Sequence, residues 1–364
     1  MIAWVHKNRR RVIVGAIIAL VVFLIAYIAI GWYLSSQLIR LGLQKVDYDQ
    51  VNVERNGDQF AIQGSAYDVD GVMGAQWNDG VGKAIFSAPS NLSKESKTSS
   101  RKVVSGSADS LLPDVKLALI GNIWEGDPKS ALGIDFQTVK YQAPLGETEA
   151  WYIPAQTSTD KWVVGVHGIG ASKAEFLRFV KPIQDSGFNM LIIDYRGDQN
   201  APKSKDGYTR LGDTEWEDLQ GAVEYAKSHG AKEINLYGVS LGGSIVQNFL
   251  RRSELGKGPL IDRVVLDSPA LDWDDIIAFR LKQKGFPTIF KYPGKDLASI
   301  RAGIDFNRVS SLNKPETITR PTLIFHGSGD KSIPNTASKQ LAEERSDKVR
   351  LLDFGNAAHA RSWN

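Results

Sequence analysis

The segment "INLYGVSLGGSIVQNFLRR", residues 234–252, changes character halfway along its length. The first part is a largely apolar run, typical of a strand buried on both faces of a sheet, and the part after Ser240 has the pattern of a helix. Glycines stand two places before and two places after this serine. A sharp strand-to-helix turn exposes a serine hydroxyl, and flanking glycines let strand and helix pack closely. The segment therefore predicts that Ser240 is a nucleophile, although the five-residue pattern alone also fits an ordinary glycine-rich loop.

The sequence around this segment alternates between strand and helix from about residue 136 onward. Strands are expected at residues 136–142, 149–153, 162–167, 190–194, 234–239, 263–267, 322–326 and 349–354. Helices are expected at residues 173–186, 213–229, 241–252 and 335–345. The continuously apolar middle strands predict a mostly parallel sheet with helices on both faces and a site at the carboxyl ends of its strands. The first two strands suit an antiparallel hairpin at one edge. Residues 270–320 break the alternation and predict an insertion, either a lid or a passive addition.

A serine nucleophile needs a base, and the chain has only five histidines. His6 precedes a long apolar segment, His167 and His326 end strands, and His229 ends a helix. His359 follows the last strand in the small-residue sequence "NAAHA" and is free for this role. A solvated tail histidine is the alternative interpretation.

The base needs a carboxylate partner, for which two candidates follow strands. Asp330, in "HGSGD", is the first choice, and Asp267 is the second. Either could instead cap a helix or stabilise a turn. Ser240, Asp330 and His359 stand in the chain order of a Ser-His-Asp triad on a doubly wound sheet.

An acyl-transfer site also needs donors for the oxyanion. The sequence "HGIG", residues 167–170, leaves a strand end without bulky side chains. The backbone N–H groups of Ile169 and Leu241 are the expected donors, and Gly170 is a near alternative. A plain strand-to-helix turn is the other interpretation of "HGIG".

The N-terminal part of the chain predicts a membrane anchor. Residues 12–34 are 23 residues without a charge, which as a helix would span about 35 Å. Lys7 and three arginines at positions 9–11 predict a cytoplasmic N-terminus, with the rest of the protein outside the cytoplasm. A cleaved signal peptide would have a shorter apolar core of about 7–15 residues, and a buried core helix is disfavoured because this segment is apolar on all faces. The expected division is a basic tail (1–11), a transmembrane helix (12–34), a β-rich extension (35–134) and a catalytic domain (135–364).

Composition excludes several classes of function. The net charge is +3 over 364 residues, and much of the excess lies at the N-terminus, so no nucleic-acid surface is expected. The chain has no cysteine, which removes thiol nucleophiles and disulfides. No His/Asp pair has metal-ligand spacing, so neither metal nor cofactor is expected. Residues 87–110 hold nine serines and predict a flexible exposed loop, with a basic membrane contact as the less favoured alternative.

The motifs together resemble the α/β-hydrolase family. "HGIG", "DYRG" (194–197), "GVSLGG", "HGSGD" and a late histidine occur in the family's order. More narrowly, the anchor, "GDPKSALGIDF" and "LGDTEWEDLQGAVEYAKSHGA" resemble membrane-anchored extracytoplasmic serine hydrolases of Gram-positive bacteria. The resemblance implies an α/β-hydrolase fold with an eight-stranded sheet and a serine hydrolase acting on small-molecule or lipid-like carboxylic esters. Thioesters and peptides stay open as substrates, and so does the oligomeric state.

One departure from the family pattern bears on activity. The family usually has a further helix after the catalytic histidine, whereas this sequence ends at Asn364, five residues after His359. We therefore expect the final helix to be missing. A catalytically silent hydrolase fold that serves as a surface binding module is the alternative function.

Overall fold

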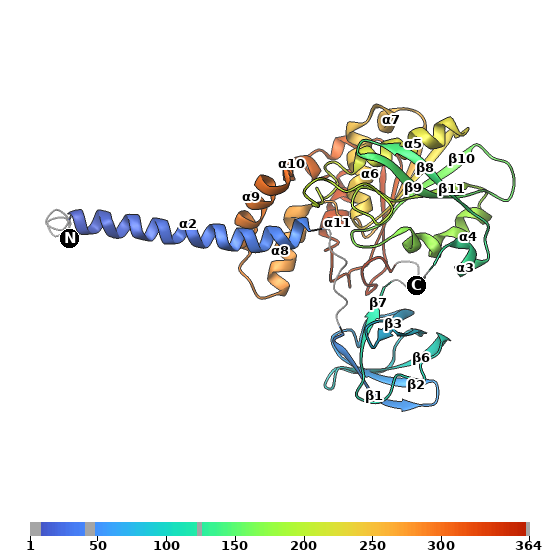
Figure 1. The fold of residues 1–364 in the computed structure, drawn as a ribbon, viewed down its shortest axis with the longest axis horizontal. Helices are drawn as coiled ribbons and strands as arrows, with labels where there is room; N and C mark the ends of the chain where they lie inside the picture. The colour runs from blue at the N-terminus through green and yellow to red at the C-terminus, as the bar shows by residue number, and fades with distance from the viewer. Residues whose placement is uncertain (1–8, 41–47, 122–125, 362–364) are drawn as a thin grey trace.

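The computed structural model describes residues 9–40, 48–121 and 126–361. Most of the predicted basic tail lies outside these ranges. The expectation about a final helix also concerns residues outside them. The described chain forms one long helix, a small antiparallel sheet and a larger mixed sheet with helices (Figure 1).

The long helix α2 (Arg9–Ile39) projects from the rest of the molecule in Figure 1. Its residues 10–39 have a mean hydropathy of 3.1 in their most apolar window, none of which is buried. By length and composition this helix can cross a membrane. Its last turn packs on the larger domain, because Ile39 is fully buried there and its carbonyl oxygen accepts the N–H of Thr209 at 3.0 Å.

The small sheet is closed. Its seven antiparallel strands are β1 (Gln50–Asn56), β2 (Gln59–Gln63), β3 (Met73–Trp77), β4 (Gly82–Phe86), β5 (Ser90–Ser93), β6 (Thr98–Gly106) and β7 (Lys116–Ile120). Their order is β2-β1-β7-β3-β4-β6-β5, and β6 also pairs with β2, which joins the two sides of the sheet. The enclosed core includes Trp77, and the rings of Phe60 and Phe86 meet edge to face at 5.3 Å.

The serine-rich stretch at 87–110 is not the predicted flexible loop. It contains β5 and the nine-residue β6, which pairs with three other strands. Serine is compatible with a strand whose outer face is exposed. Ser99 and Arg101 face inward and are buried, whereas Lys102 faces outward and is exposed. Polar composition does not indicate a loop here, because the period-two burial of a strand needs only a few inward side chains.

The larger sheet has eight strands in the order β15-β14-β13-β12-β10-β11-β9-β8. They are β8 (Gln137–Ala143), β9 (Gly146–Ile153), β10 (Lys161–Val166), β11 (Asn189–Ile193), β12 (Glu233–Val239), β13 (Ile261–Asp267), β14 (Thr322–His326) and β15 (Val349–Asp353). From β11 to β15 the neighbours are parallel, and β8 and β9 form the expected antiparallel hairpin at one edge.

Helices cover both faces of this sheet. The helical segments of this domain are α3 (Pro128–Leu132), η1 (Lys173–Phe176), α4 (Leu177–Asp185), α5 (Trp216–Ser228), α6 (Leu241–Arg252), α7 (Glu254–Lys257), α8 (Trp273–Gln283), η2 (Thr288–Phe290), α9 (Lys291–Ala302), α10 (Phe306–Val309), η3 (Pro315–Thr317) and α11 (Thr336–Glu344). Helices α5 and α6 pack in the core on one face, and η1 and α4 pack in the core on the other. The strand residues alternate between these two cores, as expected for strands buried on both faces.

The insertion after β13 comprises α8, η2, α9, α10 and η3. It is tied to the domain by the buried carboxylate of Asp213. Arg308 donates to both oxygens of this carboxylate at 2.7 and 2.6 Å, and Arg252 donates to one of them at 2.7 Å. Two arginines from different elements therefore fix α10 beside α6.

Candidate active site

The carboxyl ends of the parallel strands meet at one edge of the larger sheet. The loops that follow β10, β12, β14 and β15 carry, respectively, His167, Ser240, Asp330 and His359. This is the edge where doubly wound folds place their sites.

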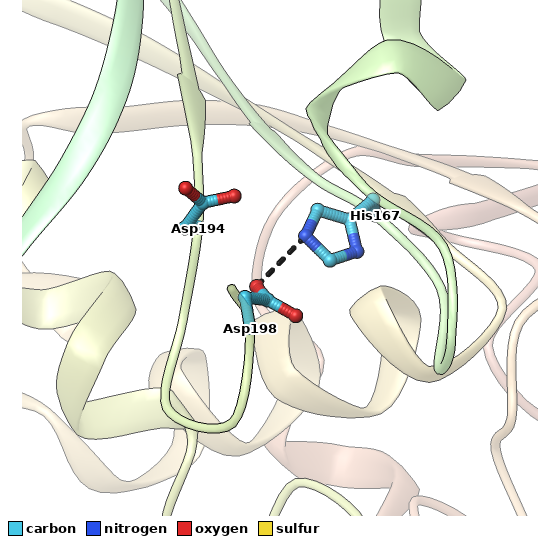
Figure 2. Close-up of side chains that lie close together, drawn as sticks. All are labelled: His167, Asp194 and Asp198. Carbon is cyan, nitrogen blue, oxygen red and sulfur yellow. Dashed lines mark hydrogen bonds and ion pairs between the residues drawn. The ribbon is translucent and has the colours of Figure 1, made fainter. Parts of the chain in front are cut away.

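At the end of β10, His167 is held on both ring nitrogens. Nδ1 lies 2.9 Å from the Gly168 carbonyl oxygen and Nε2 lies 3.0 Å from Asp198 Oδ2 (Figure 2). Since both partners are acceptors, both nitrogens donate and the ring is an imidazolium. Burial alone would lower the pKa of His167, but the charge and hydrogen bond of Asp198 outweigh burial and raise the pKa to about 9. His167 is therefore fixed as a support of the "HGIG" loop.

His167, Asp194 and Asp198 offer ligand atoms within 4.8 Å of one another, which is close enough to consider a metal ion. The buried ammonium of Lys173 already forms an ion pair with Asp194. The ring nitrogens of His167 carry protons, so neither offers a lone pair. These residues form a network of paired charges and do not fit a metal site.

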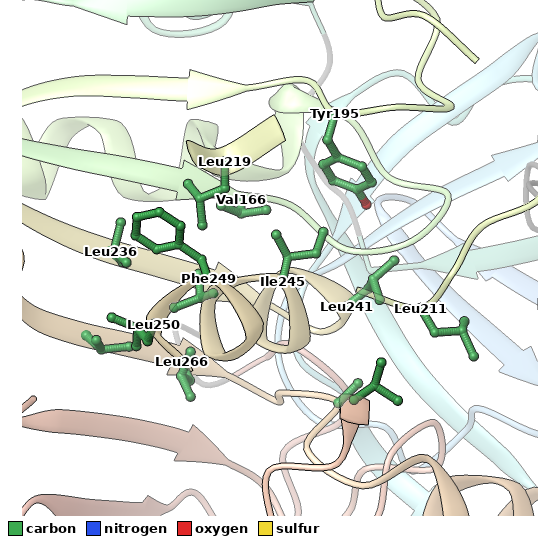
Figure 3. Packing of buried hydrophobic residues seen from close by; sticks show 14 of the residues in the cluster. Val166, Tyr195, Leu211, Leu219, Leu236, Leu241, Ile245, Phe249, Leu250 and Leu266 are labelled. Atoms are coloured by element: carbon green, nitrogen blue, oxygen red, sulfur yellow. The ribbon is translucent and has the colours of Figure 1, made fainter. Parts of the chain in front are cut away.

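Ser240 stands between β12 and α6 in a strained backbone conformation, with φ 55° and ψ −116°. A methyl group on Gly242 would lie 2.0 Å from the Val166 carbonyl oxygen, and one on Gly238 would lie 2.6 Å from the Gly242 carbonyl oxygen. Only glycine fits at these two positions. Figure 3 shows Leu241, Ile245 and Phe249 along one side of α6 in the core, which holds the helix behind the serine.

Asp330 follows β14 and is 4% exposed. Its Oδ1 accepts the N–H groups of Ser332 at 2.7 Å and Ile333 at 2.8 Å. Its Oδ2 lies 2.7 Å from Nδ1 of His359 and 3.3 Å from Nε2 of His326. Burial raises the pKa of Asp330, but the charge of His359 and the hydrogen bonds from His326, His359 and Ile333 outweigh it and hold the pKa well below its usual range.

His359 bridges the two other predicted residues. Its Nδ1 donates to Asp330, and its Nε2 lies 3.0 Å from Ser240 Oγ. Burial lowers the pKa of His359, yet the Asp330 carboxylate outweighs burial and raises the pKa above 6.5. The structure thus brings Ser240, His359 and Asp330 into one hydrogen-bonded chain, and their catalytic roles stay predictions.

The alternative acid, Asp267, lies elsewhere. It is fully buried at the end of β13, and its carboxylate oxygen Oδ2 is 4.0 Å from Nη2 of Arg178. Its backbone carbonyl oxygen accepts the Ser240 N–H at 2.9 Å. The structure therefore pairs His359 with Asp330 and gives Asp267 a place beneath the turn.

The expected oxyanion donors lie in the two loops next to the serine. Ser240 Oγ is 3.5 Å from where a Cβ on Gly168 would lie, so "HGIG" passes close to the hydroxyl. Among the described residues, the backbone N–H groups of Ile169, Gly170 and Leu241 have no hydrogen-bond acceptor. They are free to donate to a ligand, and the choice among them stays a prediction.

Two further charged residues lie near the site and were not predicted from the sequence. Glu175 Oε2 accepts the Gly168 N–H at 2.8 Å, and Arg178 donates to the Ala360 carbonyl oxygen at 3.1 Å. Both belong to a segment with a helical pattern, where charged residues normally indicate a solvated face. Their position gave a hint, because this helical segment begins directly after "HGIG". Charged residues in the first turns of such a helix lie near the carboxyl ends of the strands.

A family model and several curated proteins match parts of this chain. A family model described as serine aminopeptidase, S33, matches residues 157–310. Human protein ABHD12B is 27% identical over 260 residues, which cover 66% of this chain and 68% of ABHD12B. The uncharacterised protein YqkD of Bacillus subtilis is 26% identical over 217 residues, which cover 58% of this chain and 69% of YqkD.

A solved structure shares the arrangement of the larger domain. The Pyrococcus furiosus esterase Pf2001 matches with a TM-score of 0.52 and 24% identity, over 66% of this chain and 88% of the esterase. At this identity the likeness establishes a common fold, the α/β-hydrolase fold that the motifs predicted.

Proposed function

Because the chain belongs to the α/β-hydrolase superfamily, we propose that it is a membrane-anchored serine hydrolase that cleaves carboxylic esters. One observation carries the proposal: His359 contacts the Ser240 hydroxyl with one ring nitrogen and the Asp330 carboxylate with the other. A serine hydroxyl becomes a nucleophile only when a base in this position removes its proton.

The reaction has two halves. Ser240 Oγ attacks the acyl carbonyl carbon while Nε2 of His359 takes the hydroxyl proton, and the N–H groups of Ile169 and Leu241 bind the oxyanion. His359 then gives the proton to the departing alcohol, which leaves an acyl-serine ester. A water molecule, deprotonated by His359, attacks this ester, and His359 returns the proton to Ser240 Oγ as the ester bond breaks and the carboxylic acid leaves. Asp330 stabilises the imidazolium in both halves.

The contacts made by the last turns of α2 support its retention in the mature protein as an anchor. Ile39 is buried in the core of the hydrolase domain, and Ser35 and Ser36 are both hydrogen-bonded by Arg301 of α9. A signal peptide is removed from the mature protein, and removal here would take these packed residues away. We infer that α2 remains and that the hydrolase domain lies on the outer side of the membrane, as the basic N-terminus predicts.

A fluorophosphonate probe, which phosphonylates activated serines, tests the mechanism on the full-length protein. The wild type is expected to label and Ser240→Ala to remain unlabelled. Ser244→Ala is the matched control, because Ser244 lies four residues along the same helix with its hydroxyl bonded to the Leu211 carbonyl oxygen at 2.9 Å. Equal labelling of wild type and Ser240→Ala, or a wild type that does not label, would reject the proposal and favour the silent binding module.

Peptide hydrolysis is the second candidate, because the matching family model is described as a serine aminopeptidase. The same triad serves both reactions, since ester and amide pass through similar tetrahedral intermediates. Esters of graded acyl length and aminoacyl anilides, compared by kcat/KM on one preparation, separate the two. A preference for the anilides would replace the ester assignment and leave the triad in place.

A further inference from the structure

The outer end of α2 is joined to the helical insertion of the hydrolase domain. At Gly31 the two helices approach so closely that a methyl group would lie 2.5 Å from the Pro293 carbonyl oxygen of α9. One turn further along, Leu34 packs against Gly294, which is also buried. The two helices can therefore approach this closely because each has a glycine at the contact, Gly31 in α2 and Gly294 in α9.

Polar groups lock the same contact. Nη1 of Arg301 donates to Ser35 Oγ at 2.6 Å and Ser36 Oγ at 2.8 Å, and its guanidinium carbon lies 3.9 Å from the centre of the Trp32 ring. The Tyr27 hydroxyl donates to Asp296 at 2.5 Å. Anchor and insertion thus form one unit, and α2 sets the height of the domain above the bilayer.

The height of the domain above the bilayer depends on how many residues of α2 contact no other part of the described chain. Every residue from Arg10 to Ala26 is exposed, and Tyr27 is the first to be partly buried. The 15 residues from Val12 to Ala26 rise about 22 Å, whereas the hydrocarbon core of a bilayer is about 30 Å thick. About 8 Å of apolar core therefore surrounds the part of α2 that already contacts the insertion. A tilted helix spans less thickness for its length, so tilt increases the overlap.

The part of the insertion at this level has the surface of a membrane-contacting element. In Figure 1 the connection from α8 to α9 forms the edge of the domain nearest the free part of α2. Phe286, Ile289 and Tyr292 on this edge are 46%, 61% and 50% exposed. Lys282 and Lys284 directly precede them and form no ion pair among the described residues. Apolar side chains beside free lysines are typical of segments that lie at the lipid headgroups.

A groove of about 300 Å³ lies between the two elements. Its lining is almost entirely apolar and comes from α2 and the insertion, namely Ala29, Ile30, Tyr33, Leu34, Leu281, Phe286 and Phe290. A groove that continues the surface of a membrane-spanning helix faces acyl chains at this depth.

We propose that residues 282–292 insert into the outer leaflet beside α2, with lipid acyl chains against the groove, so that the hydrolase domain rests on the membrane surface. This rests on the proposed membrane anchor. The docking would also bring the leaflet near the triad, because α8 contacts the loop that carries Asp330. Arg280 Nε donates to the Ser332 carbonyl oxygen at 3.1 Å, and Gln283 donates to the Lys331 carbonyl oxygen at 3.0 Å.

The absence of cysteine from the chain permits a direct test. Single-cysteine variants of the full-length protein are labelled with an environment-sensitive fluorophore and reconstituted into vesicles of phosphatidylcholine and phosphatidylglycerol that carry spin-labelled lipids. Ile289→Cys reports on the proposed contact. Val81→Cys is the aqueous control, because Val81 is 88% exposed in the turn between β3 and β4, and Leu20→Cys reports on the anchor itself. Spin labels near the headgroup are expected to quench the probe at residue 289 several-fold more than the probe at residue 81.

The outcomes separate the inference from its premise. If the probe at residue 20 is quenched by lipid and the probe at residue 289 behaves like that at residue 81, the anchor stands and the docking proposal is wrong. If the probe at residue 289 is shielded from aqueous iodide but not quenched by lipid, another protein surface covers this edge and the proposal is also wrong. If the probe at residue 20 is not quenched by lipid, the anchor fails and the docking proposal falls with it.

Discussion

His167 and His359 each contact an aspartate, and what differs is the group facing the other ring nitrogen. In His167 that group is the Gly168 carbonyl oxygen, which can only accept a hydrogen bond, so the ring keeps both protons. In His359 it is the Ser240 hydroxyl, which can donate or accept. The first histidine is therefore suited to hold a loop, and the second is suited to move a proton.

This difference predicts a bell-shaped dependence of kcat/KM on pH. His359 must be neutral to accept the Ser240 proton, and its raised pKa places the midpoint of the acid limb above pH 6.5. Deprotonation of His167 removes one of the two hydrogen bonds that hold the "HGIG" loop, which carries the expected oxyanion donors Ile169 and Gly170. The stability contributed by its pair with Asp198 is complete below its unfolded pKa of about 6.5 and is lost as pH rises through about 9. Rates on a water-soluble ester check both limbs, and an acid midpoint at or below 6.5 would contradict the assignment of His359. His167→Gln should lack the alkaline limb.

At the scale of elements, the strands of the larger sheet could be predicted because they are buried on both faces. Apolar runs such as those of β10 and β11 have no other common interpretation between helices, and the β12–α6 turn follows from its glycines. The chain order of Ser240, Asp330 and His359 then fixed the expected site, and the structure brings these side chains together.

Other elements depend on contacts that no local pattern records. The closure of the small sheet depends on pairing between β2 and β6, which lie far apart in sequence. Lys173 and Arg178 look like surface charges in a helical segment, yet both side chains are buried, because carboxylates at the ends of β11 and β13 neutralise them. The packing of α9 on α2 is another such contact, since the two helices lie more than 250 residues apart.

The α2–α9 contact gives a prediction at this scale. Gly31→Leu would force the Pro293 carbonyl oxygen away, and overpacking of this kind costs about 1–3 kcal/mol. We expect hydrogen exchange across residues 291–302 to become about five- to hundredfold faster in reconstituted protein. Gly15→Leu is the matched control, because it adds the same side chain to the same helix where no atom lies within 4 Å. Equal exchange in the two variants would show that α9 does not depend on this contact.

At the scale of the whole molecule, Arg361 joins the small sheet to the loop that carries His359. Arg361, two residues after His359, is 2% exposed and donates to the backbone carbonyl oxygens of Val72 and Ile120, the latter at 3.0 Å. These carbonyls belong to the ends of the small sheet. The histidine loop, residues 354–361 with His359, is therefore held from one side by Arg178 of the hydrolase domain and from the other by the small sheet. The contact predicts that residues 50–120 help to position His359, the proposed base.

Arg361→Ala should therefore act on catalysis through the position of His359. A displacement of about 1 Å can cost up to a hundredfold in rate, so we expect kcat on a soluble ester to fall about ten- to hundredfold with KM little changed. Arg361→Lys keeps a charged donor and should restore part of the rate. Asp68→Ala is the control, because it removes an exposed contact between the same two domains, the 3.8 Å pair with Lys331, and leaves the histidine loop intact. If Arg361→Ala lowers the melting temperature but leaves kcat and fluorophosphonate labelling unchanged, Arg361 only joins the domains, and the small sheet takes no part in positioning the base.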